Sequence, residues 1–351
     1  MSEDAEILFE IRGAIGLVTL NRPKALNALT HEMCLALDAK LKEWETEAGV
    51  QAVLIEGAGE KAFCAGGDIV KLYNEGKSGG DYPYHFYRDE YLLNTRIKHF
   101  PKPYIALIDG IVMGGGVGVS VHGSHRIATE RTLFAMPESG IGLFPDVGGT
   151  YFLPRLEGEL GMYLGLTGAR LRTADSVFAG IAQRYIPSEK LPALKDALAA
   201  HEFAGDTSAE IDALIEKFAA DSGDAPIADT LPAINRHFAR GSVPAIIESL
   251  QADSDAFATK TADSLLTKSP TSMKLTFEQL RRGAKLDFDD CMRQEFRMVN
   301  RVIKGVDFYE GTRAVVIDKD QSPKWNPARL DEVSDAEIEA YFEPLPDGEL
   351  F

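Results

Sequence analysis

The sequence predicts an α/β fold followed by a mainly helical region, and two observations carry this prediction. Short apolar segments alternate with helical patterns over residues 7–190, which is typical of a sheet with largely parallel strands. After Pro187 the strand signals become rare and amphipathic helical patterns follow one another. We therefore expect two parts, residues 1–190 and residues 191–351.

The first part begins with two short strands, 7–11 and 15–20, joined by a turn at Gly13 and Ala14. Apolar residues at helical spacing then predict a helix over 30–47. Further along, the expected strands are 52–56 and 104–108, the expected helices are 69–74 and 84–99, and the segments 126–128 and 133–135 flank a charged turn. We expect the segment 76–83, rich in Gly, Ser and Asp, to be mobile.

The second part is predicted to consist of amphipathic helices. In the last of these, Phe288, Met292, Phe296 and Val299 recur every three or four residues. The predicted helical segments are 191–203, 208–218, 226–238, 244–251, 253–266, 270–282 and 287–303.

The chain's composition restricts its partners. The 351 residues include 37 Lys and Arg and 54 Asp and Glu, so the net charge of −17 argues against nucleic acid as a partner. No apolar run reaches the ~18 residues that span a bilayer, and the acidic N-terminus predicts no targeting segment, so we expect no membrane association. Eight Asp and Glu follow Arg329 without a Lys or Arg, which predicts a solvated end.

The three cysteines are far apart and show no metal-ligand spacing. Cys34, Cys64 and Cys291 are therefore interpreted as reduced thiols, which predicts a cytoplasmic protein without a metal site. Cys64 was considered as a nucleophile, but no His lies near it in the sequence, so packing in the core is the favoured interpretation.

Two carboxylates lie eight residues apart in an unusual loop, residues 136–149. Only apolar residues, small residues, glycines and a proline separate Glu138 from Asp146. Acids in such surroundings are typical of a partly dry site, where a carboxylate acts as a base or a nucleophile. The alternative is structural, with Glu138 capping a turn and Asp146 capping a helix.

Two glycine-rich turns precede predicted helices, residues 65–68 and 114–116. Glycine lets a ligand approach the backbone, and two N–H groups that converge on one oxygen form an oxyanion hole. The structural alternative is a tight turn or a close contact between helix and sheet. A dinucleotide site is disfavoured because the glycines around Gly116 lack the spacing G-x-G-x-x-G.

Together, these segments resemble a known family. Residues 21–29, the segment 61–69 with Phe63-Cys64-Ala65-Gly66-Gly67-Asp68, and residues 102–116 resemble the enoyl-CoA hydratase, or crotonase, superfamily in the family's own order. The resemblance implies a crotonase-like spiral of ββα units over residues 1–190, an acyl-CoA substrate, and no cofactor, since CoA is part of the substrate.

The resemblance also implies the roles of individual residues. The backbone N–H groups of Gly67 and Gly115 correspond to the oxyanion hole that holds the thioester carbonyl. Residues expected to contact CoA are Lys24, Ala25, Leu26, Ala65, Gly67, Asp68 and Ile69. The superfamily is often oligomeric, so a homo-oligomer is possible, although the helical region could cover the surface used for assembly.

One departure from the hydratase pattern indicates a branch of the superfamily. Hydratases use two glutamates. In this chain Gly118 stands at the position of the first glutamate and Glu138 at that of the second. Asp146 stands where hydratases usually have glycine. With residues 87–91, 307–314 and 317–325, this pattern resembles the 3-hydroxyisobutyryl-CoA hydrolase family, thioesterases of valine catabolism.

In that family the resemblance implies that Glu138 attacks the carbonyl or activates water. Asp146 would orient water or the substrate's 3-hydroxyl, and Glu90 would bind that hydroxyl, so Glu90, Gly115, Glu138 and Asp146 form the expected substrate site. The alternatives are a hydratase or isomerase that uses one acid, and a binding protein that kept the fold without catalysis.

Overall fold

The computed structural model describes residues 5–346 and 348–351, which form two compact units interleaved along the chain. Unit 1 comprises residues 1–67, 92–134 and 171–226, and unit 2 comprises residues 68–91, 135–170 and 227–351. The predicted boundary at residue 190 stays a prediction. The mixed α/β fold with mostly parallel strands is confirmed.

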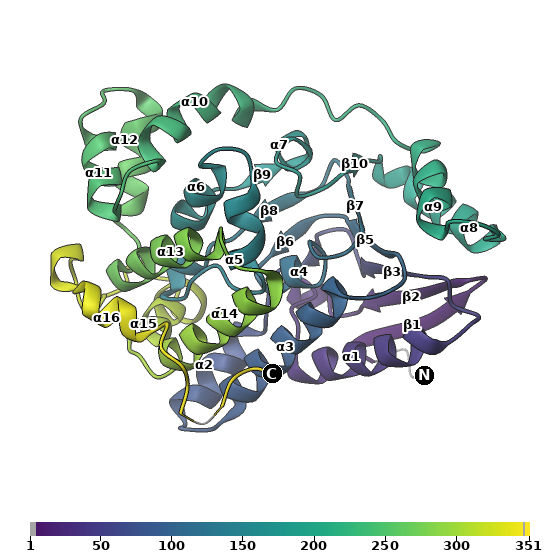
Figure 1. Ribbon diagram of the computed structural model, residues 1–351, viewed down its shortest axis with the longest axis horizontal. Coiled ribbons are helices and arrows are strands. Elements are labelled where there is room, and N and C mark those ends of the chain that lie inside the picture. The colour runs from purple at the N-terminus through teal and green to yellow at the C-terminus, as the bar shows by residue number, and fades with distance from the viewer. Residues whose placement is uncertain (1–4, 347) are drawn as a thin grey trace. The chain divides into compact units, whose positions relative to one another are not determined.

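Unit 1 is built around a six-stranded sheet of order β1-β2-β3-β5-β7-β10 (Figure 1). The hairpin β1–β2 is antiparallel, as predicted, and the remaining neighbours pair in parallel. The strands are β1 (Ile7–Arg12), β2 (Ile15–Leu20), β3 (Ala52–Gly57), β5 (Tyr104–Ile108), β7 (His125–Ala128) and β10 (Arg184–Tyr185).

A second, four-stranded sheet has the order β4-β6-β8-β9. Its strands are only two or three residues long, and the first two, which directly precede the glycine-rich turns, were not predicted. Strands this short carry no readable periodicity. They are β4 (Ala62–Cys64), β6 (Ile111–Met113), β8 (Leu133–Ala135) and β9 (Leu171–Arg172).

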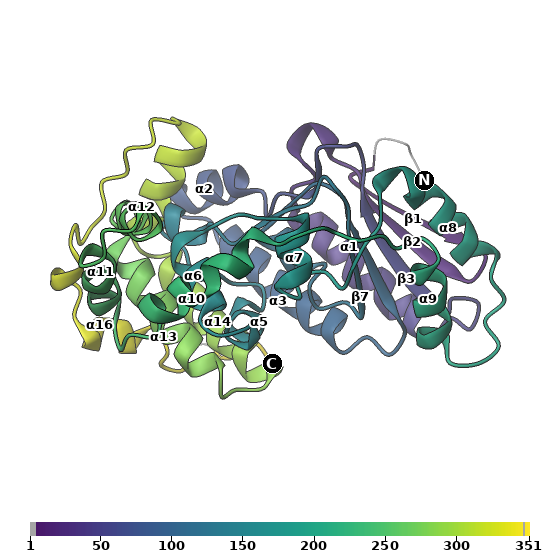
Figure 2. The ribbon, with the colours of Figure 1, turned by 90° about the horizontal axis from the view of Figure 1, so that it is seen from above.

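Helices cover the six-stranded sheet of unit 1 on both sides (Figure 2). On one side, Ile15, Leu54 and Ile105 form one buried cluster with Leu194 and Ile211 of α8 and α9. On the other side lies α1, whose N-cap Thr30 accepts a hydrogen bond from the Met33 N–H. The helices of unit 1 are α1 (His31–Thr46), α4 (Gly115–Gly118), α7 (Thr173–Phe178), α8 (Leu191–Ala200), α9 (Thr207–Glu216), η1 (Pro23–Ala25) and η4 (Ser188–Lys190).

Unit 2 is mainly helical. Its helix α13 contacts α5 and α6, and α15 contacts the 3₁₀ turn η2. The helix α3 (Tyr82–Lys98) belongs to unit 2 as far as Tyr91. The other elements are α2 (Ile69–Lys77), η2 (Glu138–Ile141), α5 (Gly149–Phe152), η3 (Leu153–Arg155), α6 (Leu160–Thr167), α10 (Pro226–Phe238), α11 (Val243–Gln251), α12 (Ala256–Leu265), α13 (Pro270–Gly283), α14 (Phe288–Val302), α15 (Asp307–Thr312), the π-helical turn η5 (Arg313–Ile317), η6 (Leu330–Glu332) and α16 (Asp335–Ala340).

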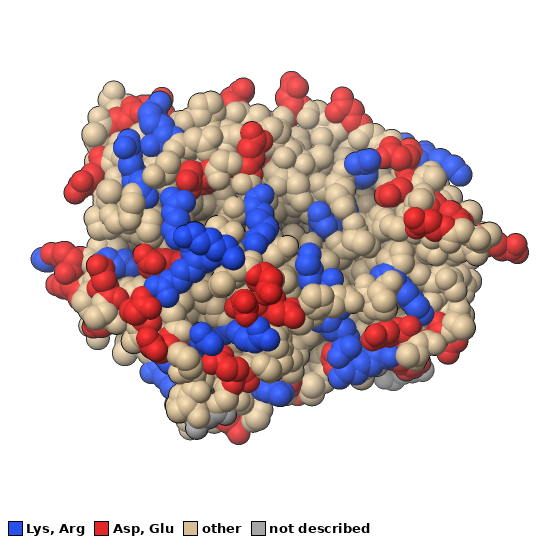
Figure 3. Space-filling view, in the orientation of Figure 1, with Lys and Arg blue, Asp and Glu red and all other residues tan. Residues whose placement is uncertain are grey.

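The acidic C-terminal segment is not simply a solvated end, so that prediction is wrong in part. Ile338 and Leu350 are buried, and Glu349 forms a salt bridge of 2.9 Å with Arg297. The prediction considered only the acids of this segment and not the cations on α13 and α14 that face them. On the face drawn in Figure 3, basic and acidic side chains are likewise interspersed.

Candidate active site

The turn η2 carries Glu138 in a buried position of unit 2. The Glu138 side chain is only 4% exposed, and its Oε2 has no hydrogen-bond partner within the described part of the chain. Helix α15 lies directly against this turn, because a Cβ added to Gly311 would come within 2.4 Å of the carbonyl carbon of Ile141. Gly142, with φ +73°, ends the turn at an equally close approach to Asp307.

This close approach predicts that Gly311→Ala destabilises the protein. The backbone around Ile141 must move to admit the methyl group, and such overpacking typically costs about 1–3 kcal/mol. Urea unfolding measures the change. Gly241→Ala is the matched control, because a Cβ at Gly241 meets nothing within 4 Å, and equal midpoints for the two variants would contradict the prediction.

Asp146 lies in the same buried cluster as Glu138. It is 3% exposed, and its Oδ2 accepts a hydrogen bond of 2.9 Å from the Tyr91 hydroxyl of α3. Glu90, the residue before Tyr91, is 2% exposed, and its Oε1 has no partner in the described chain. The structure thus brings together Glu90, Glu138 and Asp146, the three acids that the sequence singled out.

Burial raises the pKa of every acid in this cluster. Burial is the main cause of the raised pKa of Glu138, and the negative charge of Asp146 adds to it. Burial also raises the pKa of Asp146 to about 7, although the hydrogen bond from Tyr91 acts in the opposite direction. The pKa of Glu90 is raised by burial and then by Asp146. Raised pKa values of this kind are typical of acids that act in a reaction.

The capping interpretation of the two acids is wrong. The N-caps of η2 and α5 are Pro137 and Gly148, and neither helix end has a side-chain cap. The hydrogen bond that Asp146 accepts comes from the Tyr91 hydroxyl, 55 positions away along the chain. Acidic side chains that cap nothing need another reason to be buried.

Sequence reasoning missed three polar side chains of this cluster. Glu295 of α14 is fully buried and accepts hydrogen bonds from the N–H groups of Gly148 and Thr150 at 2.8 and 2.9 Å. Gln279 of α13 donates to the Pro145 carbonyl at 2.6 Å. The Tyr87 hydroxyl is buried without a partner in the described chain. A signal existed for Glu295, because it lies on the apolar face formed by residues 288, 292, 296 and 299.

Unit 1 brings the two glycine-rich turns together. Gly66 has φ +117°, and a Cβ on it would lie 3.8 Å from the Gly115 nitrogen. Gly115 is the first residue of α4, so its N–H belongs to the groups that have no acceptor within the helix. Gly67, half-buried, follows Gly66 directly. The roles of Gly67 and Gly115 as oxyanion donors stay predictions.

The glycine at position 116 is required by packing. A Cβ there would lie 2.1 Å from the carbonyl oxygen of Cys64, which is impossible without moving the backbone. Cys64 is fully buried, in agreement with its interpretation as a core residue. Gly118, where hydratases have their first glutamate, is the buried last residue of α4.

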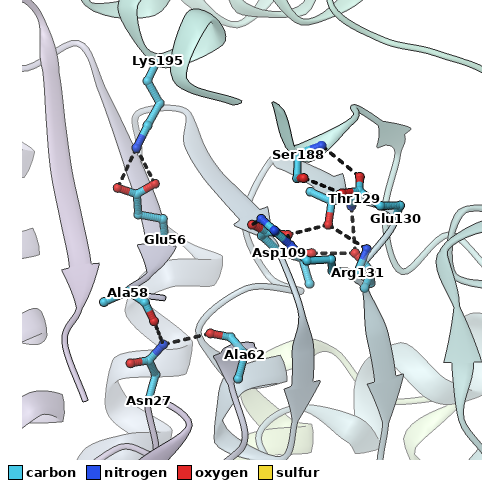
Figure 4. Close-up of polar contacts among 12 residues, drawn as sticks. Asn27, Glu56, Ala58, Ala62, Asp109, Thr129, Glu130, Arg131, Ser188 and Lys195 are labelled. Atoms are coloured by element: carbon cyan, nitrogen blue, oxygen red, sulfur yellow. Dashed lines mark hydrogen bonds and ion pairs between the residues drawn. The ribbon is translucent and has the colours of Figure 1, made fainter. Parts of the chain in front are cut away.

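The segments expected to bind CoA are joined by backbone hydrogen bonds in unit 1. The Ala65 N–H donates to the Leu26 carbonyl at 3.0 Å, and the Leu29 N–H donates to Gly66 at 2.8 Å. Asn27 braces this loop, since its side-chain amide donates to the carbonyls of Ala58 and Ala62 (Figure 4).

The remaining predicted CoA contacts lie at the ends of short helices. Lys24 and Ala25 are exposed in η1. In unit 2, Asp68 caps α2 by accepting from the Lys71 N–H at 3.1 Å, and Ile69 is the first residue of that helix. Contact of these residues with CoA stays a prediction.

A charged network supports the strand that leads to Gly115. Asp109, at the turn between β5 and β6, accepts hydrogen bonds from Thr129 at 2.6 Å and from Arg131 Nε at 2.8 Å (Figure 4). The Leu133 N–H donates to the Gly110 carbonyl of the same turn at 3.1 Å. This network ties β6 to the turn between β7 and β8.

Neither a metal cluster nor a membrane-spanning helix is found in the described ranges. Within residues 5–346 and 348–351, His, Cys, Asp and Glu side chains nowhere gather in a group of three or more suited to a metal ion. Across the same residues, every helix is too short or too polar to cross a bilayer.

Comparison with known proteins decides the family. The sequence pattern of the enoyl-CoA hydratase/isomerase family matches residues 15–342. This chain belongs to that family. A solved structure titled carnitinyl-CoA dehydratase, from Mycobacterium thermoresistibile, has a TM-score of 0.93 and 42% identity and covers 99% of both chains. An enoyl-CoA hydratase structure from Rhodobacter sphaeroides has a TM-score of 0.91 and 37% identity, over 99% of this chain and 100% of that one.

Curated relatives in the family carry a different name. The mitochondrial 3-hydroxyisobutyryl-CoA hydrolase of Danio rerio is 48% identical over 99% of this chain and 91% of its own length. The human protein of the same name is 45% identical over 98% of this chain and 90% of its own length. The resemblance stated from the sequence motifs is therefore confirmed.

The same relatives contradict the prediction of a cytoplasmic location. Their names place them in the mitochondrion. The prediction depended on three reduced cysteines, and all three are buried thiols outside any disulfide. Reduced thiols indicate a reducing compartment, but they do not show which reducing compartment it is.

Proposed function

We propose that this chain hydrolyses the thioester of a short 3-hydroxyacyl-CoA, most specifically 3-hydroxyisobutyryl-CoA, to the free hydroxy acid and CoA. One observation carries the proposal: relatives named for this reaction match nearly the whole chain. An acyl-CoA is the substrate class that the family's name indicates.

Thioester hydrolysis needs a polarised carbonyl and an activated oxygen nucleophile. We assign the first task to the N–H groups of Gly67 and Gly115, which would stabilise the negative charge on the carbonyl oxygen. Removing one such donor typically costs about 10²- to 10³-fold in rate. CoA leaves as a thiolate, so no strong general acid is required.

Glu138 takes the second task, in one of two ways. As a nucleophile, its carboxylate forms a bond to the carbonyl carbon, the C–S bond breaks, and water then hydrolyses the mixed anhydride. As a general base, it accepts a proton from water while the water oxygen attacks the same carbon. The raised pKa of Glu138 suits the second route, because a less acidic carboxyl group is a stronger base when ionised.

Asp146 and Glu90 are assigned to the 3-hydroxyl of the substrate or to the attacking water. Ionised Asp146 would accept a hydrogen bond from this group, and Glu90, whose Oε1 lacks a partner in the described chain, would bind the hydroxyl. A buried acceptor without a partner favours a ligand that brings a donor.

A thiol-reactive dye tests the proposal directly. Purified protein is incubated with 3-hydroxyisobutyryl-CoA, 3-hydroxypropionyl-CoA, isobutyryl-CoA and acetyl-CoA, and released CoA is measured. We expect thiol release to be fastest for the two hydroxyacyl thioesters. No release from any short 3-hydroxyacyl-CoA would reject the proposal.

A second candidate, hydration or dehydration of an acyl-CoA, is favoured by the titles of the two similar solved structures. Against it stands Gly118, which leaves the chain without the first hydratase glutamate. Crotonyl-CoA separates the two functions, because hydration removes the absorbance of the conjugated enoyl thioester without releasing thiol.

The remaining functional assignments also belong to this proposal. We propose that the reaction needs no cofactor, and that neither nucleic acid nor a membrane is a partner of the chain. A homo-oligomer is the remaining possibility for assembly, which the molar mass in solution would test.

A further inference from the structure

The turn that carries Asp146 is strained. Val147 has φ +51°, a left-handed conformation that a β-branched residue rarely adopts, and Gly148 follows at φ +90°. A residue held in such a conformation costs about 1–3 kcal/mol and persists only where its surroundings fix it. The contacts that fix this turn therefore also fix the carboxylate of Asp146.

Those contacts come from two helices of the C-terminal region. Glu295 of α14 receives the N–H groups of Gly148 and Thr150, one on each carboxylate oxygen. Gln279 of α13 donates to the Pro145 carbonyl at 2.6 Å and to the Thr150 hydroxyl at 2.7 Å. The turn is thus held on both sides of Val147.

Glu295 itself is mostly uncharged near neutral pH. Burial is the main cause that raises the pKa of Glu295 to about 8, and the charge of Asp146 adds to it. Asp146, with a pKa of about 7, therefore ionises first. Gln279 carries no charge and contacts the same turn.

We infer that Glu295 is a positioning residue for the reaction, which holds the strained turn after Asp146 through two backbone N–H groups. The inference rests on the proposed function, because the experiment measures thiol release, but it does not depend on which CoA thioester is the substrate. It also assigns a role to the C-terminal region, which supplies the two side chains that hold the loop.

Three variants test whether Glu295 and Gln279 hold the turn after Asp146. Glu295→Gln keeps the size but removes the charge and turns an N–H donor toward one backbone N–H. Glu295→Asp keeps the charge but is one methylene too short to receive both N–H groups. Gln279→Met removes a neutral clamp of the same turn. Asp290→Asn, an exposed acid of α14, is the matched control.

The experiment compares kcat, KM and the pH profile of thiol release for all four variants. We expect Glu295→Gln to lower kcat about 10- to 100-fold with little change in KM, and to leave the acid limb of the profile in place, because Glu295 is mostly protonated while Asp146 titrates. Glu295→Asp should also lower kcat and leave the limb in place. Gln279→Met should lower kcat and leave the limb in place, and Asp290→Asn should match the wild type.

Each outcome decides between positioning and plain stability. Lowered unfolding midpoints with an unchanged kcat would reduce Glu295 to a structural residue and overturn the inference. If Glu295→Gln does not fold, Glu295→Asp still decides, because an unchanged kcat in that variant overturns the positioning role.

The wild type is assayed first, so failure of the proposed function is seen separately. Wild-type protein that hydrates crotonyl-CoA but releases no thiol rejects the hydrolase, and the same four variants are then compared on hydration. If the wild type turns over neither substrate, there is no reaction for Glu295 to serve, and the inference is overturned together with the proposed function.

Discussion

Glu138→Gln is expected to lower the rate of thiol release by about 10²- to 10⁴-fold, the usual contribution of a general base. The amide has the size of the carboxyl group but is neither nucleophilic nor basic. Because the Glu138 side chain is buried and its raised pKa disfavours the charged form, the neutral variant should fold at least as well as the wild type. Initial rates with 3-hydroxyisobutyryl-CoA measure the effect.

The matched control for this variant is Glu248→Gln on the exposed side of α11. It removes one negative charge from unit 2 at a distant helix and should keep the full rate. Retained acyl-CoA binding by Glu138→Gln shows that only the chemical step is lost. A variant that keeps more than about a tenth of the wild-type rate would exclude Glu138 from both roles, since a tenfold change corresponds to only about 1.4 kcal/mol of barrier.

Isotope labelling separates the two roles of Glu138. In a single turnover in ¹⁸O-water, direct attack by water places ¹⁸O in the hydroxy acid. A mixed anhydride that water opens at the Glu138 carbonyl instead places ¹⁸O in the enzyme and leaves the first product unlabelled. Mass spectrometry of product and protein reads both.

The sequence allowed prediction of those elements whose periodicity is long enough to read. The helix over 226–238 and the strand over 104–108 have the predicted bounds, and α1 differs from its prediction by one residue at each end. The strands β4 and β6, three residues each, lie beside the two glycine-rich turns and were missed. They pair with each other, and such long-range pairing leaves no local pattern.

The acids of the candidate site were predictable because they stand in surroundings where a charge is costly. Glu138 and Asp146 were found in an apolar loop, and Glu90 came from the family resemblance. Glu295 was missed because an acid within a long amphipathic helix is ordinarily assigned to the solvated face. Its partners, Gly148 and Thr150, lie more than 140 positions away, so only the folded chain shows that it is satisfied.

The pH dependence of the reaction should report the charge of Asp146. Its pKa of about 7 means that it is protonated at pH 6 and mostly ionised at pH 8. If the ionised form accepts the hydrogen bond from water or the 3-hydroxyl, the rate rises with pH through about 7. Asp146→Asn is expected to lower the rate about 10²-fold or more and to remove this limb from the profile.

The pH dependence of stability gives a second test of the raised pKa of Asp146, again with Asp146→Asn. The folded-state pKa of Asp146 lies above the ordinary value of 3.8, so the folded wild type binds the proton more tightly and loses stability as pH rises from about 4 to about 7. Asp146→Asn lacks this loss, which amounts to at most about 4 kcal/mol. Urea unfolding at pH 5 and pH 8 should show the variant gaining on the wild type at the higher pH; equal differences at both would contradict the raised pKa.

Tyr91→Phe tests the source of that pKa. The Tyr91 hydroxyl donates to Asp146 Oδ2 and so favours the ionised carboxylate. A hydrogen bond to a charged group is worth about 1.5–3 kcal/mol, so its loss should raise the pKa of Asp146 and move the acid limb about one to two pH units higher. Tyr104→Phe, which removes another buried hydroxyl that donates to the Val119 carbonyl, should leave the limb in place. If the acid limb of the pH profile stays in place in Tyr91→Phe, or persists in Asp146→Asn, the group that titrates is Glu138 and not Asp146.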